Sequence, residues 1–276
     1  AEKALYNAKL NGIHYAYYDS KLYNSENINE SILEILNYNI SNNLVEPFFQ
    51  PIIDTKTEEV EKYEALMRIY DKEGNILSPF VYIHKAKKAR LYTKLMEILI
   101  TKVVEYIKEY KINVSINLDY TDILNPYFKK SLLAKINTNK IGKYLTIEIL
   151  EGERISNYDM VNDFIKALRK YDVKIAIDDF GTGFSNYEYI LSLDIDYIKI
   201  DGSLIRKIDE DIYLNLAKSI VLFSKQQDIK IVAEFVSDLK ILRYVNAIGI
   251  DYAQGFYLGK PQSIETIFGE KNEKRT

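Results

Sequence analysis

Polar side chains end a series of short apolar runs in this chain, and their types and spacing could support chemistry. Successive members lie between 21 and 35 residues apart, roughly the length of one strand–helix repeat. They are Asn117, Glu148, Asp178, Lys199 and Glu234. Side chains alternate across a strand, and in each run the polar residue lies opposite an apolar face. If the strands are parallel, the five polar groups converge at one end of the sheet.

Carboxylate and amide oxygens gathered in this way suit hard divalent cations such as Mg²⁺ or Mn²⁺. The chain has no Cys and only two His, which excludes thiol catalysis and Cys-ligated metals and nearly excludes a Ser-His-Asp triad. Without a cation, the converging carboxylates would repel one another and their pKa values would rise. Asp178 and Asp179 stand before Gly181 and Gly183, a pattern typical of a strand that runs into a flexible loop over a site.

Each of these residues also has an ordinary structural explanation. A single acid at a strand end usually caps the next helix, Lys199 alone would be a solvated strand end, and Asn117 alone a turn residue. The occurrence of five polar strand ends, all on the same face of their strands, counts against that explanation. A different chemistry, a barrel aldolase with Lys199 as a Schiff-base amine, is opposed by the surrounding carboxylates, which would keep the amine protonated.

Eight short β-branched runs are expected to position these side chains, with amphipathic helices between most of them. Such an order of strand and helix favours an α/β fold, a modified TIM (β/α)8 barrel, over a doubly wound sheet, because no Gly-rich phosphate-binding turn follows any run. The first two runs are too close for an intervening helix, so we predict a hairpin and one antiparallel strand. The runs are 45–53, 59–70, 112–118, 144–150, 173–178, 195–201, 229–234 and 251–256, and the clearest helices are 157–171, 207–227 and 238–247.

Charge and hydropathy limit the partners of the chain. The 37 basic and 40 acidic residues give a net charge of −3, which lacks the polybasic character of a duplex nucleic acid binder. No stretch approaches the roughly 20 apolar residues that span a bilayer, and the first residues lack both Met and a signal peptide. We therefore expect a cytoplasmic chain without membrane contact, cut from a longer protein.

Longer motifs lie along the same runs. They are Gln50-Pro51-Ile52, Tyr63-Glu64-Ala65-Leu66-Met67-Arg68, Asn117-Leu118, Glu148-Ile149-Leu150-Glu151, Asp178-Asp179-Phe180-Gly181-Thr182-Gly183, Lys199-Ile200-Asp201, Ala233-Glu234 and Gln254-Gly255. With these motifs the chain resembles an EAL domain, a phosphodiesterase of the bacterial second messenger cyclic di-GMP. The resemblance covers residues 44–262, and we assign 44–265 as the barrel domain.

The resemblance implies the metal-dependent hydrolysis of cyclic di-GMP to linear pGpG, assisted by two Mg²⁺ or Mn²⁺ ions, and a role for each matching residue. One ion would be held by Glu64, Asn117, Glu148 and Asp178, and the second by Asp178, Asp179 and Glu234. Lys199 and Gln254 would lie beside the attacking water and, with Glu64 and Glu234, form the catalytic set. The substrate contacts would be Gln50, Arg68 and Asp201, and Glu151 would anchor the loop that begins at Asp178.

The same comparison of motifs suggests what surrounds the barrel. Residues 1–20 resemble the closing helix and strand of a GGDEF domain, 21–43 read as a linker helix, and 266–276 as a charged tail. The parent protein would then carry upstream GGDEF and sensor domains that could tie it to a membrane. Because EAL domains often pair through helices beside the active-site loop, a homodimer is also expected.

The chain departs from the family pattern mainly after Glu234. Phe235 replaces a Gly, and Ser237 replaces a Glu that helps to order the metal site. Other departures are Ala86-Lys87, Arg90, Asp119 and Ser185-Asn186. Every expected metal ligand is retained, so we expect metal binding to survive. The alternative function is a catalytically weak or inactive module that binds cyclic di-GMP and transmits a signal.

Overall fold

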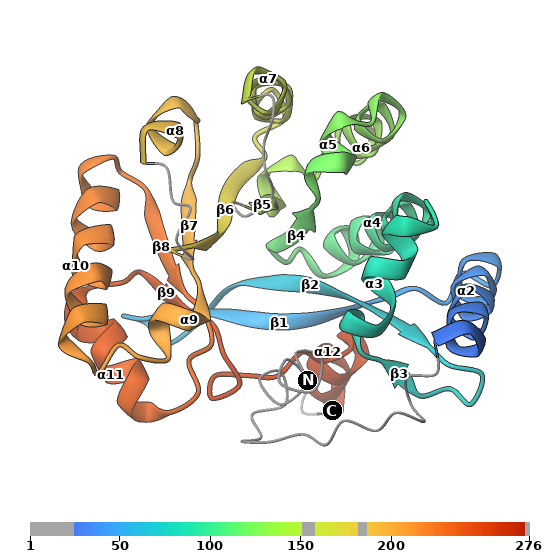
Figure 1. Cartoon of the computed structure of the whole chain (residues 1–276). Coiled ribbons are helices and arrows are strands. Elements are labelled where there is room, and N and C mark those ends of the chain that lie inside the picture. Colours follow the sequence, from blue (N-terminus) through green and yellow to red (C-terminus); the bar gives the residue numbers. More distant parts are fainter. Residues whose placement is uncertain (1–24, 151–157, 182–186, 274–276) are drawn as a thin grey trace. The chain divides into compact units, whose positions relative to one another are not determined.

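The computed structural model describes residues 25–150, 158–181 and 187–273 (Figure 1). The chain divides into two compact units, one of residues 1–44 and 69–92, the other of residues 45–68 and 93–276. The segment 69–92, which begins with the end of the second strand, joins the first unit, and the domain boundaries expected from the sequence stay a prediction. The resemblance of residues 1–20 to a GGDEF domain concerns residues outside the described ones.

The first unit contains helix α2 (Ser25–Ser41), the end of strand β2 (Val60–Tyr70), strand β3 (Ile76–Leu77) and helix α3 (Pro79–Lys88). The helix expected within 21–43 is thus present as α2, and its role as a linker stays a prediction. The Asn39 amide ties α2 to β2, since it accepts a hydrogen bond from the Tyr70 N–H at 3.0 Å and donates one to the Tyr70 carbonyl at 2.8 Å.

Strands of the second unit close into a ring in the order β1-β9-β8-β7-β6-β5-β4-β2, with β2 paired to β1. β1 runs antiparallel to both of its neighbours, and the remaining pairs of the ring are parallel. The predicted modified barrel with a hairpin and one antiparallel strand is therefore confirmed. The other strands are β1 (Glu46–Asp54), β4 (Val114–Leu118), β5 (Leu145–Leu150), β6 (Lys174–Phe180), β7 (Tyr197–Ile200), β8 (Lys230–Ala233) and β9 (Tyr252–Ala253).

Helices follow most of these strands and lie around the ring (Figure 1). They are α4 (Tyr92–Tyr110), α5 (Tyr120–Leu124), α6 (Pro126–Asn139), the 3₁₀ turn η2 (Gly142–Tyr144), α7 (Tyr158–Arg169), α8 (Tyr187–Ser192), α9 (Gly202–Ile205), α10 (Asp211–Gln226), α11 (Leu239–Ile248) and α12 (Ile264–Glu273). The three helices predicted from periodicity correspond to α7, α10 and α11. Helix α12 includes most of the segment expected as a charged tail. Among the described helices, none is both long and apolar enough to cross a membrane.

The interior of the ring is built in layers, as strand alternation requires. One layer is a buried cluster of Ile52, Ala176, Tyr197 and Val232, with Tyr252 packed against it. Each of these five residues has a buried polar residue two positions away, toward the other end of the ring. The polar residue comes earlier in the antiparallel β1, and it comes later in, or just after, the four parallel strands. These polar residues are Gln50, Asp178, Lys199, Glu234 and Gln254. Inside the ring, an apolar layer thus lies next to a polar layer.

Candidate active site

Lys199, on β7, is the centre of the polar layer and is completely buried. Its ammonium group lies 2.6 Å from Glu148 Oε2 and 2.7 Å from Glu234 Oε1. It is also 3.1 Å from Asp178 Oδ1 and 3.4 Å from Glu64 Oε2. Burial alone would lower the pKa of Lys199, but the four carboxylates outweigh it and raise that pKa well above its ordinary value. A neutral Schiff-base amine is therefore disfavoured, as the sequence argument against an aldolase predicts.

Glu64, on β2, is held as a carboxylate by amide donors on both sides. Asn117 Nδ2 donates to its Oε1 at 2.5 Å, and Gln254 Nε2 donates to its Oε2 at 2.7 Å. Burial raises the pKa of Glu64, but Lys199 and these two amides outweigh burial and leave the pKa below its usual value. The strands place these groups together, because Asn117 lies directly opposite Glu148 on β5, and Glu64 lies opposite Gln50 on β1.

The other buried acids of the site show the opposite shift. Burial raises the pKa of Glu148 to about 7, with Lys199 opposing it and Glu64 reinforcing it. Burial and neighbouring acids likewise raise the pKa of Asp178, and they raise the pKa of Glu234 well above its usual range. One ammonium group cannot balance four carboxylates, so some of these acids retain protons that a bound cation would displace.

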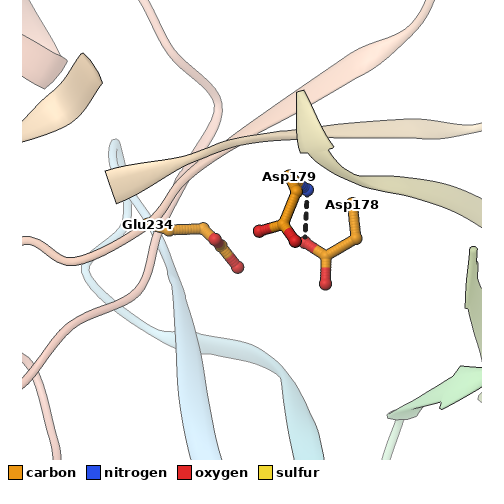
Figure 2. Close-up of side chains that lie close together, drawn as sticks. All are labelled: Asp178, Asp179 and Glu234. Atoms are coloured by element: carbon orange, nitrogen blue, oxygen red, sulfur yellow. Dashed lines mark hydrogen bonds between the residues drawn. The ribbon is translucent and has the colours of Figure 1, made fainter. Parts of the chain in front are cut away.

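A β-bulge brings two consecutive acids to the same site. β6 pairs with β7 through Ile177 and then Phe180, while β7 advances only from Ile198 to Ile200. The extra residue lets Asp179 face the site beside Asp178, with its backbone in the left-handed region at φ 59°. The Asp179 N–H donates to Asp178 Oδ1 at 3.0 Å, and the Glu234 carboxylate faces both aspartates (Figure 2).

Oxygen atoms available to a cation are present in two places. One carboxylate oxygen from each of Asp178, Asp179 and Glu234 lies within 4.8 Å of the others. In addition, the buried Asn117 Oδ1 and Glu148 Oε1 have no hydrogen-bond partner among the described residues. A buried oxygen left without a donor is costly, and a divalent cation would satisfy it. The residues present therefore fit such ions.

The remaining predicted residues lie at different distances from this centre. Gln50 is buried, donates to the Gly259 carbonyl at 3.1 Å and accepts from Gln254 at 3.3 Å, so it joins the polar layer. Arg68 donates to the Met67 carbonyl at 2.9 Å, with its guanidinium 5.6 Å from the Phe48 ring centroid. Asp201 caps α9 by accepting from the Ser203 N–H at 2.8 Å. Glu151 lies outside the described residues.

Lys62 is a charged residue near the site that the sequence analysis missed. It is buried on β2, with Nζ 3.5 Å from the centroid of the Tyr197 ring and without a hydrogen-bond partner among the described residues. Burial lowers the pKa of Lys62 to about 8. Its position two residues before Glu64 gives it the same strand parity, and that parity could have placed it inside the barrel.

Comparison with known families matches residues 33–261 to the EAL domain. This chain belongs to the EAL domain family. The match begins within α2, earlier than the predicted start at residue 44. Among curated EAL relatives, the cyclic di-GMP phosphodiesterase PdeA of Borreliella burgdorferi is 32% identical over 82% of this chain. The probable cyclic di-GMP phosphodiesterase PdeG of Escherichia coli is 30% identical over 83% of the chain.

The chain spans only 35% and 46% of the lengths of these two relatives. Among solved structures, the PaMucR phosphodiesterase in complex with c-di-GMP superimposes with a TM-score of 0.80. That comparison covers 86% of this chain and 99% of the PaMucR chain at 22% identity. At this identity the structural likeness supports the EAL fold, and the sequence relatives support the family.

Proposed function

We propose that this EAL barrel hydrolyses cyclic di-GMP to linear pGpG. The observation that carries the proposal is the arrangement of Asp178, Asp179 and Glu234 around one small space beside the buried ammonium of Lys199. A phosphodiester is anionic, and its hydrolysis needs positive charge near the phosphoryl oxygens and an oriented water. The names of the curated relatives point to the same substrate.

Two Mg²⁺ or Mn²⁺ ions are part of the proposal. Glu64, Asn117, Glu148 and Asp178 would hold one, and Asp178, Asp179 and Glu234 the other. When bound, such ions would acidify a water and neutralise charge on the phosphoryl oxygens. The unpartnered oxygens of Asn117 and Glu148 and the close acidic trio support this assignment.

The residues of the chain itself would orient the reacting groups. Lys199, kept protonated by its four carboxylates, is a fixed donor that can hold the oxygen of the attacking water. Gln254 already donates to Glu64 and would lie at the edge of the same water position. In the reaction, a bond forms between the water oxygen and phosphorus, the bond from phosphorus to the ribose 3′ oxygen breaks, and that oxygen takes a proton.

Substrate binding is assigned to groups around this centre. Gln50 and Arg68 would donate to the substrate, the latter as a planar pair toward a phosphate. Asp201 would contact the substrate while it caps α9, and Glu151 would anchor the loop after Asp178. An upstream GGDEF domain with sensor domains, a homodimer and a cytoplasmic location are further proposals for the whole protein.

The second candidate function is a binding module that holds cyclic di-GMP without turnover. The departures Phe235 and Ser237 favour it. Ser237 is exposed, and its Oγ donates to Asp238 Oδ2 at 3.0 Å. A serine hydroxyl cannot supply the charge of the glutamate expected there. Metal binding without hydrolysis would follow if that charge were needed to order the site.

Chromatography of cyclic di-GMP incubated with the pure chain and Mg²⁺ or Mn²⁺ tests both candidates. The intact chain is expected to produce pGpG, and Glu64→Ala is expected to abolish it. Glu59→Gln, an exposed acid before the same strand, is the matched control and should leave turnover unchanged. Hydrolysis that persists in Glu64→Ala would overturn the enzymatic proposal. Unchanged substrate with measurable binding to the intact chain would instead establish the binding module.

A further inference from the structure

Phe235 has an unusual backbone and an unusual position. It directly follows Glu234, so its Cα lies about 3.8 Å from that of a residue in the acidic trio. Its φ is 54°, in the left-handed region that glycine adopts without strain. Its side chain is 45% exposed, so burial in a core does not account for it. A strained and exposed aromatic residue beside a reaction centre calls for a functional explanation.

The ring of Phe235 is held in place by the first turn after β7. A Cβ built on Gly202 would lie 2.2 Å from Phe235 Cδ2, so the ring packs directly on the Gly202 backbone. The Arg206 guanidinium carbon lies 4.6 Å from the ring centroid, and Arg206 Nε donates to the Gly202 carbonyl at 2.9 Å. Gly202 and Arg206 are one helical turn apart, so they contact the ring from the same element.

Phe235 thus presents a half-exposed ring, fixed by Gly202 and Arg206, one residue after Glu234 of the acidic trio. In a cyclic dinucleotide, each base is joined through one ribose to the phosphates, so a base must lie close to the phosphate that reacts. Every nucleobase has a π-face that stacks on aromatic side chains. The Arg206 guanidinium beside the ring adds positive charge, which suits a guanine edge with its O6 and N7 acceptors.

We infer that Phe235, supported by Gly202 and Arg206, is a stacking residue for one guanine of the bound dinucleotide. The inference rests on the proposed function, because it names a substrate contact at the same site. A stacking contact of this kind contributes about 10- to 100-fold in affinity. Stacking on Phe235 would therefore contribute to the affinity for the dinucleotide, at a position where glycine would adopt the same backbone conformation without strain.

The decisive variant is Phe235→Gly, because it separates a role of Phe235 in substrate binding from a role in stability. Glycine suits a φ of 54°, so the variant should melt at the same or a higher temperature than the intact chain. If Phe235 stacks on the substrate, the same variant should raise KM for cyclic di-GMP about 10- to 100-fold and change kcat by less than about threefold. Phe235→Tyr should retain the KM of the intact chain.

Leu222→Ala is the matched control, since Leu222 is an exposed apolar residue on α10. It should leave KM unchanged. If the intact chain binds without turnover, the same comparison is made with Kd from calorimetry. Two results would overturn only this inference and leave the proposed function in place. One is an unchanged KM or Kd in Phe235→Gly, and the other is weaker binding that accompanies a lower melting temperature. Neither binding nor turnover by the intact chain would overturn the proposed function and the inference with it.

Discussion

Lys199 Nζ and Glu148 Oε2 lie 2.6 Å apart inside the barrel, where neither side chain is more than 1% exposed. Both groups would be expensive to bury alone, so each depends on the other. The pair is not balanced, however, because Glu64, Asp178 and Glu234 share the same ammonium. Lys199 therefore acts as the internal counter-charge of the site, and the acids that it does not balance can exchange their protons for cations.

Replacement of Lys199 should affect stability and activity together. Lys199→Met leaves the buried carboxylates without a cation, so the metal-free variant should lose about 3 kcal/mol of unfolding free energy at pH 7. Turnover should fall at least about 100-fold because the fixed donor is lost. Urea unfolding without metal measures the first effect, and pGpG formation the second. The stability loss should shrink at pH 5, where Glu148, with a pKa of about 7, is protonated; a loss of equal size at both pH values would contradict this account.

Divalent cations should stabilise the folded chain. Because they bind the acids of the folded site, Mn²⁺ at 100 times its Kd should add about 2.7 kcal/mol to the unfolding free energy. Differential scanning fluorimetry after treatment with a chelator and titration of Mn²⁺ measures the shift. Asp179→Asn, which removes one member of the acidic trio, should reduce it, and Asp159→Asn on the exposed side of α7 should not. Equal shifts in all three proteins would place the ion elsewhere.

Lys62 should make stability depend on pH above neutrality. Its pKa is lowered from 10.5 to about 8 in the folded chain, so below pH 8 folding must bury a charged amine. Between pH 8 and the unfolded pKa the folded state binds fewer protons than the unfolded state, and this contribution to stability increases with pH. Lys62→Met should therefore stabilise the metal-free chain by on the order of 2 kcal/mol at pH 7.

The gain from Lys62→Met should diminish as the pH approaches 10. Urea unfolding of both proteins from pH 7 to pH 10 measures it. Lys56→Met, in the exposed turn between β1 and β2, serves as the control and should show no such dependence. A gain that increases with pH would mean that Lys62 is not buried as a destabilising cation.

Gly255 joins two parts of the polar layer through its backbone. A Cβ there would lie 2.1 Å from the Val236 carbonyl oxygen and 2.3 Å from its nitrogen. Val236 N–H also donates to the Gln254 carbonyl at 2.9 Å, so a shift would move the segments that carry Glu234 and Gln254. Gly255→Ala should destabilise the chain by about 1–3 kcal/mol and lower turnover more than about tenfold.

Gly269 offers a matched substitution for comparison. A Cβ at this residue of α12 meets nothing within 4 Å, so Gly269→Ala should stabilise the chain by about 0.5–1 kcal/mol and leave turnover unchanged. Thermal melts and initial rates for both variants test the pair. Similar effects of the two substitutions would show that the close approach at Gly255 does not matter.

Strand parity explains how much of the site could be predicted from the sequence. Alternation predicts one inner face for five residues, and in the structure ion pairs and a hydrogen bond to Glu64 bring them together around Lys199. They are Asn117, Glu148, Asp178, Lys199 and Glu234. Asp179 breaks that alternation, because only the bulge between Ile177 and Phe180 lets two consecutive acids face one site. A bulge depends on the register of two strands that are distant in sequence, so no local pattern reveals it.

Four features can be inferred from the sequence without the structure: the repeating strand–helix order, the hairpin, the inner polar face and the family. These follow from local periodicity and motif spacing, which depend on side chains near one another in the chain. Tertiary structure alone decided which partners each charge has. It placed Lys199 among four carboxylates, Lys62 on the ring of Tyr197 and Phe235 on Gly202. Burial and distance set the energy of a charge or a ring contact, and both exist only once distant strands have closed into the barrel.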